Sequence, residues 1–246
     1  MPVSWRRPGE IEVNRHLMAR SSNKIGVYLE IGKKRTFAGV IDLPGWCRSG
    51  RDEGSALQAL VEYGPRYARV LHATRTGFQA PADTSAFVVI ERLEGNTTTD
   101  FGAPDVVPSS DTGPVDDAEL RRFQMLLKAC WRAFDAAVKA ATGKALRKGP
   151  RGGGRELKGI VLHVLGSDAS YLARLGWKLK SGDENDLSQE LCHTRQAILN
   201  ALGSAARGEV SAHGPRGGVR WTPRYFVRCV AWHVLDHAWE IEDRIV

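Results

Sequence analysis

Apolar and polar residues alternate in two neighbouring stretches near the start of the chain, residues 24–32 (KIGVYLEIG) and 35–45 (RTFAGVIDLPG). Alternation with a period of two places successive side chains on opposite faces of a strand. Only a turn of two to three residues separates the two stretches, so together they predict an antiparallel hairpin.

A helix and a further strand follow the predicted hairpin. Residues 51–71 carry apolar side chains at helical spacing, with Asp52 placed to act as the N-cap. Pro65 is expected to kink or split this helix, because proline cannot donate the backbone hydrogen bond that the helix needs. Residues 86–95 (AFVVIERLEG) predict a strand. This part of the chain therefore predicts a small β-β-α-β sheet with a helix on one face.

The second half of the chain shows a period near 3.6 residues. Four long amphipathic helices are predicted, at residues 117–141, 154–178, 187–206 and 222–245. The start of the last one is well marked, because Thr222 can cap it and Pro223 fits its first position. Four amphipathic helices of similar length predict a four-helix bundle.

The fold class predicted from these patterns is α+β with two domains. Residues 21–95 form the α/β domain and residues 117–246 form the all-α bundle. Residues 96–116 are rich in Thr, Ser, Asp, Pro and Gly and have no period, so they predict a linker. Residues 1–20 also lack a period and predict a disordered tail, with Met18 as an alternative start of translation.

Composition narrows the classes of function. Hydrophobic residues at 42% and charged residues at 26% are ordinary for a globular protein. No apolar run approaches the roughly 18 residues of a membrane helix, so no membrane partner is expected. The N-terminal residues lack the apolar segment of a secretory signal, and the four cysteines are scattered without a C-x-x-C pair. These features predict a cytoplasmic protein.

The net charge of +7 indicates a surface that attracts anions. Small anionic substrates and nucleic acid both fit that charge, and no known nucleic-acid-binding module is present. We expect a small-molecule substrate and no nucleic acid, although the charge leaves nucleic acid open. A homodimer is compatible with the sequence.

Three histidines fall where a metal could be held. In the last predicted helix, His233 and His237 are four residues apart and lie on the stripe that a bundle normally fills with apolar side chains. His163 lies one step from the apolar stripe of the second helix, at a similar depth along its helix. Three imidazoles with an open fourth position are typical of a catalytic metal site. Two partly buried histidines with polar neighbours are the alternative.

This arrangement resembles the DinB/YfiT-like superfamily over residues 117–246. The resemblance rests on the order of four helices, on the single histidine of the second helix in the setting LHVLGSDASYLAR, and on the H-x3-H of the last helix. It implies a four-helix bundle whose divalent metal is held by His163, His233 and His237, without distinguishing Zn, Ni, Fe or Mn. It also implies a low-molecular-weight thiol as a cofactor, since members with known activity include thiol-dependent S-transferases and isomerases.

One feature departs from this superfamily, whose bundles usually run up-down-down-up. That order needs a long crossover between the second and third helices, where this chain has only about ten residues (LKSGDENDLS). A simple up-down-up-down order therefore stays open.

The N-terminal part resembles HicB-like proteins over residues 25–93, through a strand that ends in Pro-Gly, a glycine turn and a helix with an ALQAL run. The resemblance implies a small unit that binds a toxin or another protein. No DNA-reading module is attached, so an accessory or dimerising domain is the preferred interpretation.

Two similar glycine-rich segments, KGPRGGGRE (148–156) and HGPRGGVRW (213–221), precede the two histidine-bearing helices. Backbone amides at a helix N-terminus and an arginine can hold a carboxylate or a phosphate. The candidate anion-binding residues are Arg151, Arg155, Arg216 and Arg220. Flexible connectors are the alternative, and a joint site requires that both segments lie at one end of the bundle. Glu240 is a candidate acceptor for an imidazole N–H.

Two functions follow from these features. The first is a divalent-metal-dependent enzyme, such as a thiol-dependent S-transferase or isomerase. The second is a non-catalytic binding module in which the HicB-like domain and the basic segments contact a protein or nucleic acid.

Overall fold

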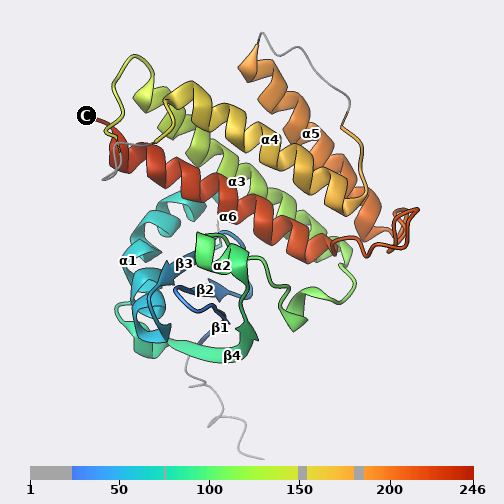
Figure 1. Cartoon of the computed structure of the whole chain (residues 1–246), viewed down its shortest axis with the longest axis horizontal. Helices are drawn as coiled ribbons and strands as arrows, with labels where there is room; N and C mark the ends of the chain where they lie inside the picture. Colours follow the sequence, from blue (N-terminus) through green and yellow to red (C-terminus); the bar gives the residue numbers. More distant parts are fainter. Residues whose placement is uncertain (1–23, 75, 149–153, 180–185) are drawn as a thin grey trace, which may run out of the picture.

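The computed structural model describes residues 24–74, 76–148, 154–179 and 186–246, and the predicted tail at residues 1–20 lies outside them. The fold is α+β, with a small sheet followed by helices (Figure 1). The strands and α-helices are β1 (Ile25–Ile31), β2 (Thr36–Val40), β3 (Cys47–Gly50), α1 (Glu53–Leu71), β4 (Phe87–Glu94), α2 (Thr97–Phe101), α3 (Asp117–Ala141), α4 (Leu157–Leu175), α5 (Leu187–Ala206) and α6 (Pro223–Arg244).

The sheet has four strands in the order β3-β2-β1-β4. The predicted hairpin is confirmed, since β1 and β2 pair antiparallel. Strand β4 pairs parallel with β1, because the chain crosses over through α1 before it returns. Strand β3 was not predicted. Its four residues, CRSG, have no apolar alternation, and their pairing with β2 depends on the turn before them.

Helix α1 begins at the predicted cap and ends at Leu71, as predicted. The Asp52 carboxylate accepts a hydrogen bond from the Ser55 backbone N–H, and the Ser55 hydroxyl is bonded to the Asp52 backbone N–H in return. Pro65 was expected to kink or split the helix, and the split does not occur, because α1 runs unbroken to Leu71. The turn at Pro65 lacks one backbone hydrogen bond, and the packing of α1 between the sheet and α3 stabilises the helix there.

The sheet forms a middle layer, because both faces of β1 are buried. Val27 and Leu29 belong to the main apolar cluster, together with side chains of α1. On the opposite face, the Tyr28 ring lies 5.1 Å from the guanidinium carbon of Arg228 of α6. Glu30, also on that face, is fully buried. The sheet is therefore covered by α1 on one side and by α6 on the other.

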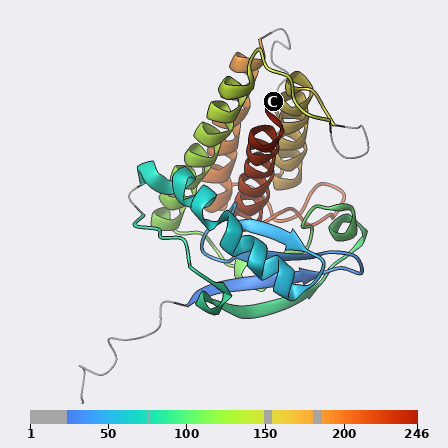
Figure 2. The same cartoon turned by 90° about the vertical axis from the view of Figure 1, so that its left-hand side faces the viewer.

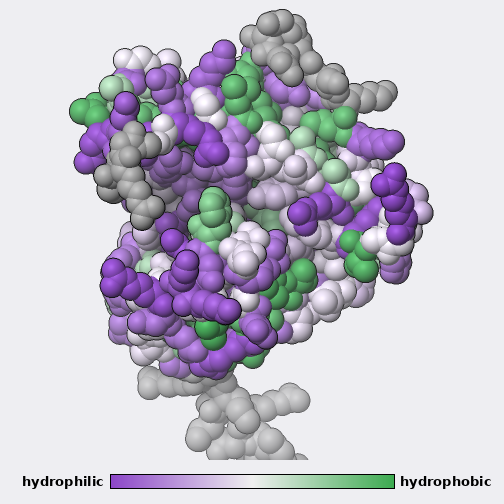
Figure 3. All heavy atoms as spheres, in the orientation of Figure 1, coloured by the Kyte–Doolittle hydropathy of each residue, from purple (hydrophilic) through white to green (hydrophobic). Residues whose placement is uncertain are grey.

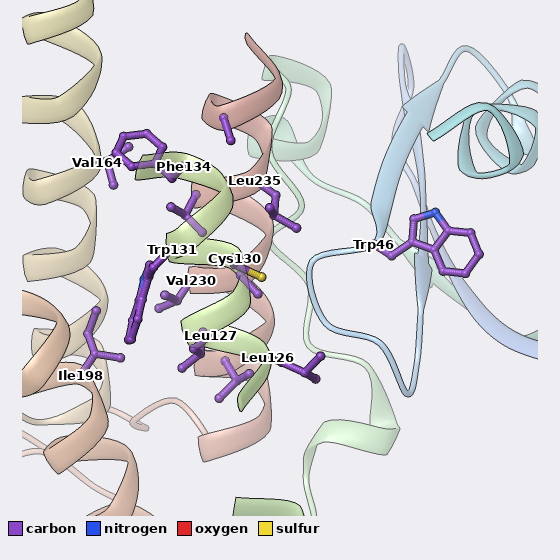
Figure 4. Packing of buried hydrophobic residues seen from close by; sticks show 14 of the residues in the cluster. Trp46, Leu126, Leu127, Cys130, Trp131, Phe134, Val164, Ile198, Val230 and Leu235 are labelled. Atoms are coloured by element: carbon purple, nitrogen blue, oxygen red, sulfur yellow. The ribbon is translucent and has the colours of Figure 1, made fainter. Parts of the chain in front are cut away.

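Four long helices pack side by side over the sheet (Figure 2). Helices α3 and α4 each contact both α5 and α6. Figure 4 shows Trp131 of α3 between Val164 of α4 and Ile198 of α5, while Trp46 lies apart among the strands. The predicted cap of the last helix is confirmed, because the Thr222 hydroxyl accepts from the Tyr225 N–H with Pro223 at the first position.

The helix directions follow from contacts between helix ends. The segment after α3 lies beside the end of α6, where Leu146 and Ile245 form a β-bridge. Trp221, just before α6, donates its N–H to the carbonyl of Arg174 at the end of α4. Leu157 and Leu187, the first residues of α4 and α5, line one pocket. Helices α4 and α5 are therefore parallel, and the order is up-down-down-up (Figure 1).

Helix α6 is buried on nearly all sides, with 15 of its 22 residues buried. Its Arg228 reaches the sheet side and forms an ion pair with Asp111, a residue of the segment predicted to be a linker. That segment, residues 96–116, also contains α2 and a short 3-10 helix at Ser109–Asp111. Because α6 shares buried surface with both parts of the chain, the packing does not single out two separate domains.

Among the described residues, no helix is both long and apolar enough to cross a membrane.

Candidate metal centre

The three histidines predicted as ligands come together between α4 and α6. The Nε2 atom of His233 lies 3.2 Å from Nε2 of His163 and 3.2 Å from Nε2 of His237. One nitrogen of each ring lies within 4.8 Å of the other two. The four-residue spacing within α6 sets one pair, and the packing of α4 on α6 supplies the third ring.

Glu240 orients one of these rings, as its position one turn further along α6 suggested. The Glu240 carboxylate lies 2.7 Å from Nδ1 of His237 and also accepts a hydrogen bond from Arg244. These bonds from His237 and Arg244 lower the pKa of Glu240. A carboxylate on Nδ1 fixes the proton there and leaves the Nε2 lone pair directed at the other rings.

Burial keeps the other two rings neutral. It lowers the pKa of His233, with further lowering from His237, His163 and Arg155. The pKa of His163 is lowered by burial, by His237 and by Arg155. Neutral imidazoles offer the lone pair that a metal needs.

The Nε2 atoms of the three rings can bind one cation. With the proton of His237 held on Nδ1 by Glu240, its Nε2 presents a lone pair towards His233. A metal ion between the rings would accept one Nε2 lone pair from each. The proton of His233 would then be on Nδ1, which is buried without a partner among the described residues.

The spacing of the nitrogens fits one metal ion. A tetrahedral centre with bonds of about 2.1 Å requires its nitrogen ligands to lie about 3.4 Å apart. Two of the three separations are 3.2 Å, close to that value, and the ligand atoms of His163 and His237 lie within 4.8 Å of each other. A three-histidine set with borderline-soft nitrogen donors suits Zn, Ni or Fe, and it also leaves one position for a further ligand.

The candidate anion-binding arginines lie at two ends of the helices. Arg155 is near the start of α4, where its backbone carbonyl accepts from Arg244. The Arg220 side chain lies beside Gly176, just after the end of α4. The 19 residues of α4 separate these ends by about 28 Å. A joint site is therefore excluded for Arg155 and Arg220.

The remaining two arginines add no shared site. Arg216 lies in the turn between His213 and Val219 that precedes α6, on the Arg220 side. Arg151 lies outside the described residues. Of the three candidate arginines that the structure describes, Arg155 is the one whose charge lowers the pKa of His163 and His233.

A pocket of about 370 Å³ opens beside the histidine cluster, at His163. His163 lines it at one end. Three parts of the chain supply its other residues. Helix α4 contributes Gly166, Ser167, Ser170, Tyr171 and Arg174. Trp221 lies just before α6, which contributes Tyr225, Cys229 and Trp232, and the segment after β4 contributes Thr98, Ala103, Pro104 and Asp105. Figure 3 shows this side of the molecule, where residues of intermediate hydropathy gather over α4 and α6.

The sheet positions one wall of this pocket through Glu30. Its buried carboxylate accepts hydrogen bonds from the Thr99 hydroxyl and from the backbone N–H groups of Asp105 and Val106. Burial raises the pKa of Glu30, and these bonds oppose the rise. The sequence did not single out Glu30 or the pocket wall, because their contacts join residues more than 60 positions apart.

Replacing Glu240 with glutamine is expected to weaken metal binding about 10–100-fold. Glutamine removes the charge that holds the proton on Nδ1 of His237. Competition against a coloured chelator measures the metal dissociation constant. Glu242→Gln is the matched control, because Glu242 is on the same helix and pairs with Arg66 instead. Equal affinities for the two variants would contradict a role of Glu240 at the metal.

Comparisons with protein-family models, curated proteins and solved structures give no match to this chain, so the DinB/YfiT-like and HicB-like resemblances stay predictions.

Proposed function

We propose that this protein is a divalent-metal-dependent enzyme with His163, His233 and His237 as the metal ligands. The observation that carries the proposal is the convergence of three imidazoles, one of which, His163, lines a pocket. A metal there would lower the pKa of a bound thiol or water and so supply a nucleophile near neutral pH.

The surrounding residues have separate tasks in this proposal. Glu240 holds the proton of His237 on Nδ1. Arg155 adds positive charge near the histidines, which favours an anionic reactant. Trp232 and Tyr225 cover the α6 side of the pocket and exclude water from it.

The reaction class follows from the resemblance to DinB/YfiT-like proteins, whose known members include thiol-dependent S-transferases and isomerases. In an S-transfer, the thiolate sulfur forms a bond to an electrophilic carbon, the leaving group departs with its electron pair, and the thiol proton passes to solvent. In this proposal, residues 117–246 are the catalytic bundle and the HicB-like residues 21–95 are an accessory domain that supports the pocket wall.

The test begins with metal content. Protein purified without chelators is expected to carry about one divalent metal per chain. Conjugation of glutathione to an aryl chloride should stop after dialysis against dipicolinate and return when metal is restored. Protein that carries little metal, and that is retained on nucleic acid in a salt-sensitive manner, would contradict the proposal and favour a binding module.

A further inference from the structure

The pocket at the histidines is a channel that follows one face of α4. The residues of α4 that line it are His163, Gly166, Ser167, Ser170, Tyr171 and Arg174. Steps of three and one residues keep these positions on one helical face for three turns. Cα atoms of the first and last are separated by about 16 Å along the helix axis. The channel is therefore suited to an elongated molecule.

Gly166 is an exposed position that lines the channel near His163. A methyl group built on Gly166 would meet no atom within 4 Å, so the space beside it is open. Glycine inside a helix is less stable than alanine, and no neighbouring atom requires a glycine at this position. Its missing side chain leaves space that a ligand can fill.

The channel also presents polar groups to a bound molecule. The Ser167 and Ser170 side chains line it, together with Asp105, whose carboxylate already accepts a hydrogen bond from Asn96. The hydroxyl of Tyr225 is buried and has no hydrogen-bond partner among the described residues. It can bond to a ligand only if its side chain moves.

The far end of the channel carries a positive charge. The guanidinium carbon of Arg174 lies 5.1 Å from the centre of the Trp221 ring, which holds the side chain over an aromatic face. No carboxylate of the described ranges forms an ion pair with Arg174. A guanidinium held in this way can bind a carboxylate through two parallel hydrogen bonds.

We infer that this channel binds an elongated small molecule whose terminal carboxylate lies against Arg174 and Trp221 and whose other end reaches His163. The inference deepens the proposed function, and depends on it only at the histidine end. A carboxylate-bearing thiol satisfies both ends, since its sulfur can lie at the metal while Arg174 fixes the carboxylate.

The probes are mercaptooctanoate and its uncharged analogue mercaptooctanol, titrated into the full chain by calorimetry. The acid is expected to bind wild-type protein more tightly than the alcohol. Arg174→Gln should weaken binding of the acid about tenfold or more and leave the alcohol unchanged. Gly166→Phe should abolish binding of both probes, because its ring fills the channel.

Two matched variants separate binding from folding. Lys158→Gln removes one positive charge from the same helix at a position that lines a different pocket, so its affinities should equal those of wild type. Gly166→Ala should fold and bind both probes. Acid binding that is unchanged by Arg174→Gln, or that persists in Gly166→Phe, would overturn the inference.

Chelator-treated protein distinguishes this inference from the proposed function. Dependence of acid binding on Arg174 should persist without metal, because that end of the channel contains none of the three histidines. A preference for mercaptooctanoate over its methyl thioether should need the metal. If the Arg174 dependence is present and no metal restores a thiol preference, the channel is supported and the metal-dependent function is contradicted.

Discussion

His233→Ala is expected to yield a protein that retains almost none of the divalent metal carried by wild type. His233 Nε2 is the central atom of the cluster, 3.2 Å from each of the other two nitrogens. Without it, His163 and His237 remain as only two ligands, and a site of that kind rarely holds a metal through purification. Elemental analysis of the two proteins after identical purification measures the effect.

The same substitution should remove the stabilising effect of the metal. A ligand that binds only the folded state at 100 times its dissociation constant adds about 2.7 kcal/mol to the free energy of unfolding. Wild-type protein should therefore melt at a higher temperature when the metal is added, whereas His233→Ala should not respond. Comparing each protein with its own chelator-treated form removes the separate cost of truncating a buried side chain.

His193→Ala is the control, since His193 is an exposed histidine of α5. This control should retain wild-type metal content and the metal-dependent rise in melting temperature. Equally little metal in wild type and His233→Ala would remove the basis for a metal-dependent enzyme.

The histidine cluster could be predicted because helical periodicity is a local property. The period alone placed His233 and His237 on one face of their helix. Equal depth from the two helix starts, as predicted, does not bring His163 to the other rings, because α4 and α6 are antiparallel. His163 lies six residues after the start of α4, and His237 lies seven before the end of α6. Both are thus at a similar distance from the same end of the bundle.

The pocket could not be predicted because its walls come from distant parts of the chain. Ser167, Ser170 and Arg174 form a small, polar stripe, which in sequence is indistinguishable from a solvent-facing side of α4. That stripe faces a pocket only because Glu30 fixes the segment at Asp105 and Val106 opposite it. Such contacts depend on tertiary packing and leave no periodic signal.

The position of α6 between two layers did leave a signal. Apolar residues such as Val227, Val234 and Leu235 lie outside the stripe that faces the bundle, and all three are buried. A helix that is apolar on most sides predicts burial on most sides. That pattern argues for a sheet packed directly on α6 rather than for a domain held at a distance by a linker.

Asp111→Asn is expected to lower the free energy of unfolding by about 3–5 kcal/mol. Two nitrogens of Arg228 donate to the Asp111 carboxylate at 2.6 and 2.7 Å, and both side chains are almost fully buried. Asparagine keeps the size of the side chain but leaves the guanidinium charge buried without a counter-ion. Urea unfolding followed by circular dichroism, with linear extrapolation to water, measures the change.

Asp236→Asn provides the matched comparison for this effect. It makes the same chemical change opposite Arg48, at an equal distance of 2.7 Å, and it also lies between α6 and the sheet. The Asp236 side chain is 39% exposed, so its ion pair should contribute no more than about 1 kcal/mol. Similar losses in the two variants would show that burial of the Arg228 pair does not stabilise the junction between α6 and the sheet.

Arg228 also forms hydrogen bonds to the sheet, and these affect the stability expected for a double variant. Its guanidinium also donates to the backbone carbonyls of Val40 and Ile41 at the end of β2. Arg228→Met combined with Asp111→Asn removes the unpaired charge but leaves these two carbonyls without their donor. The double variant should therefore be less destabilised than the sum of the single variants, and still less stable than wild type. Since the same helix carries His233 and His237, metal retention in these variants measures how far the histidine cluster depends on the sheet.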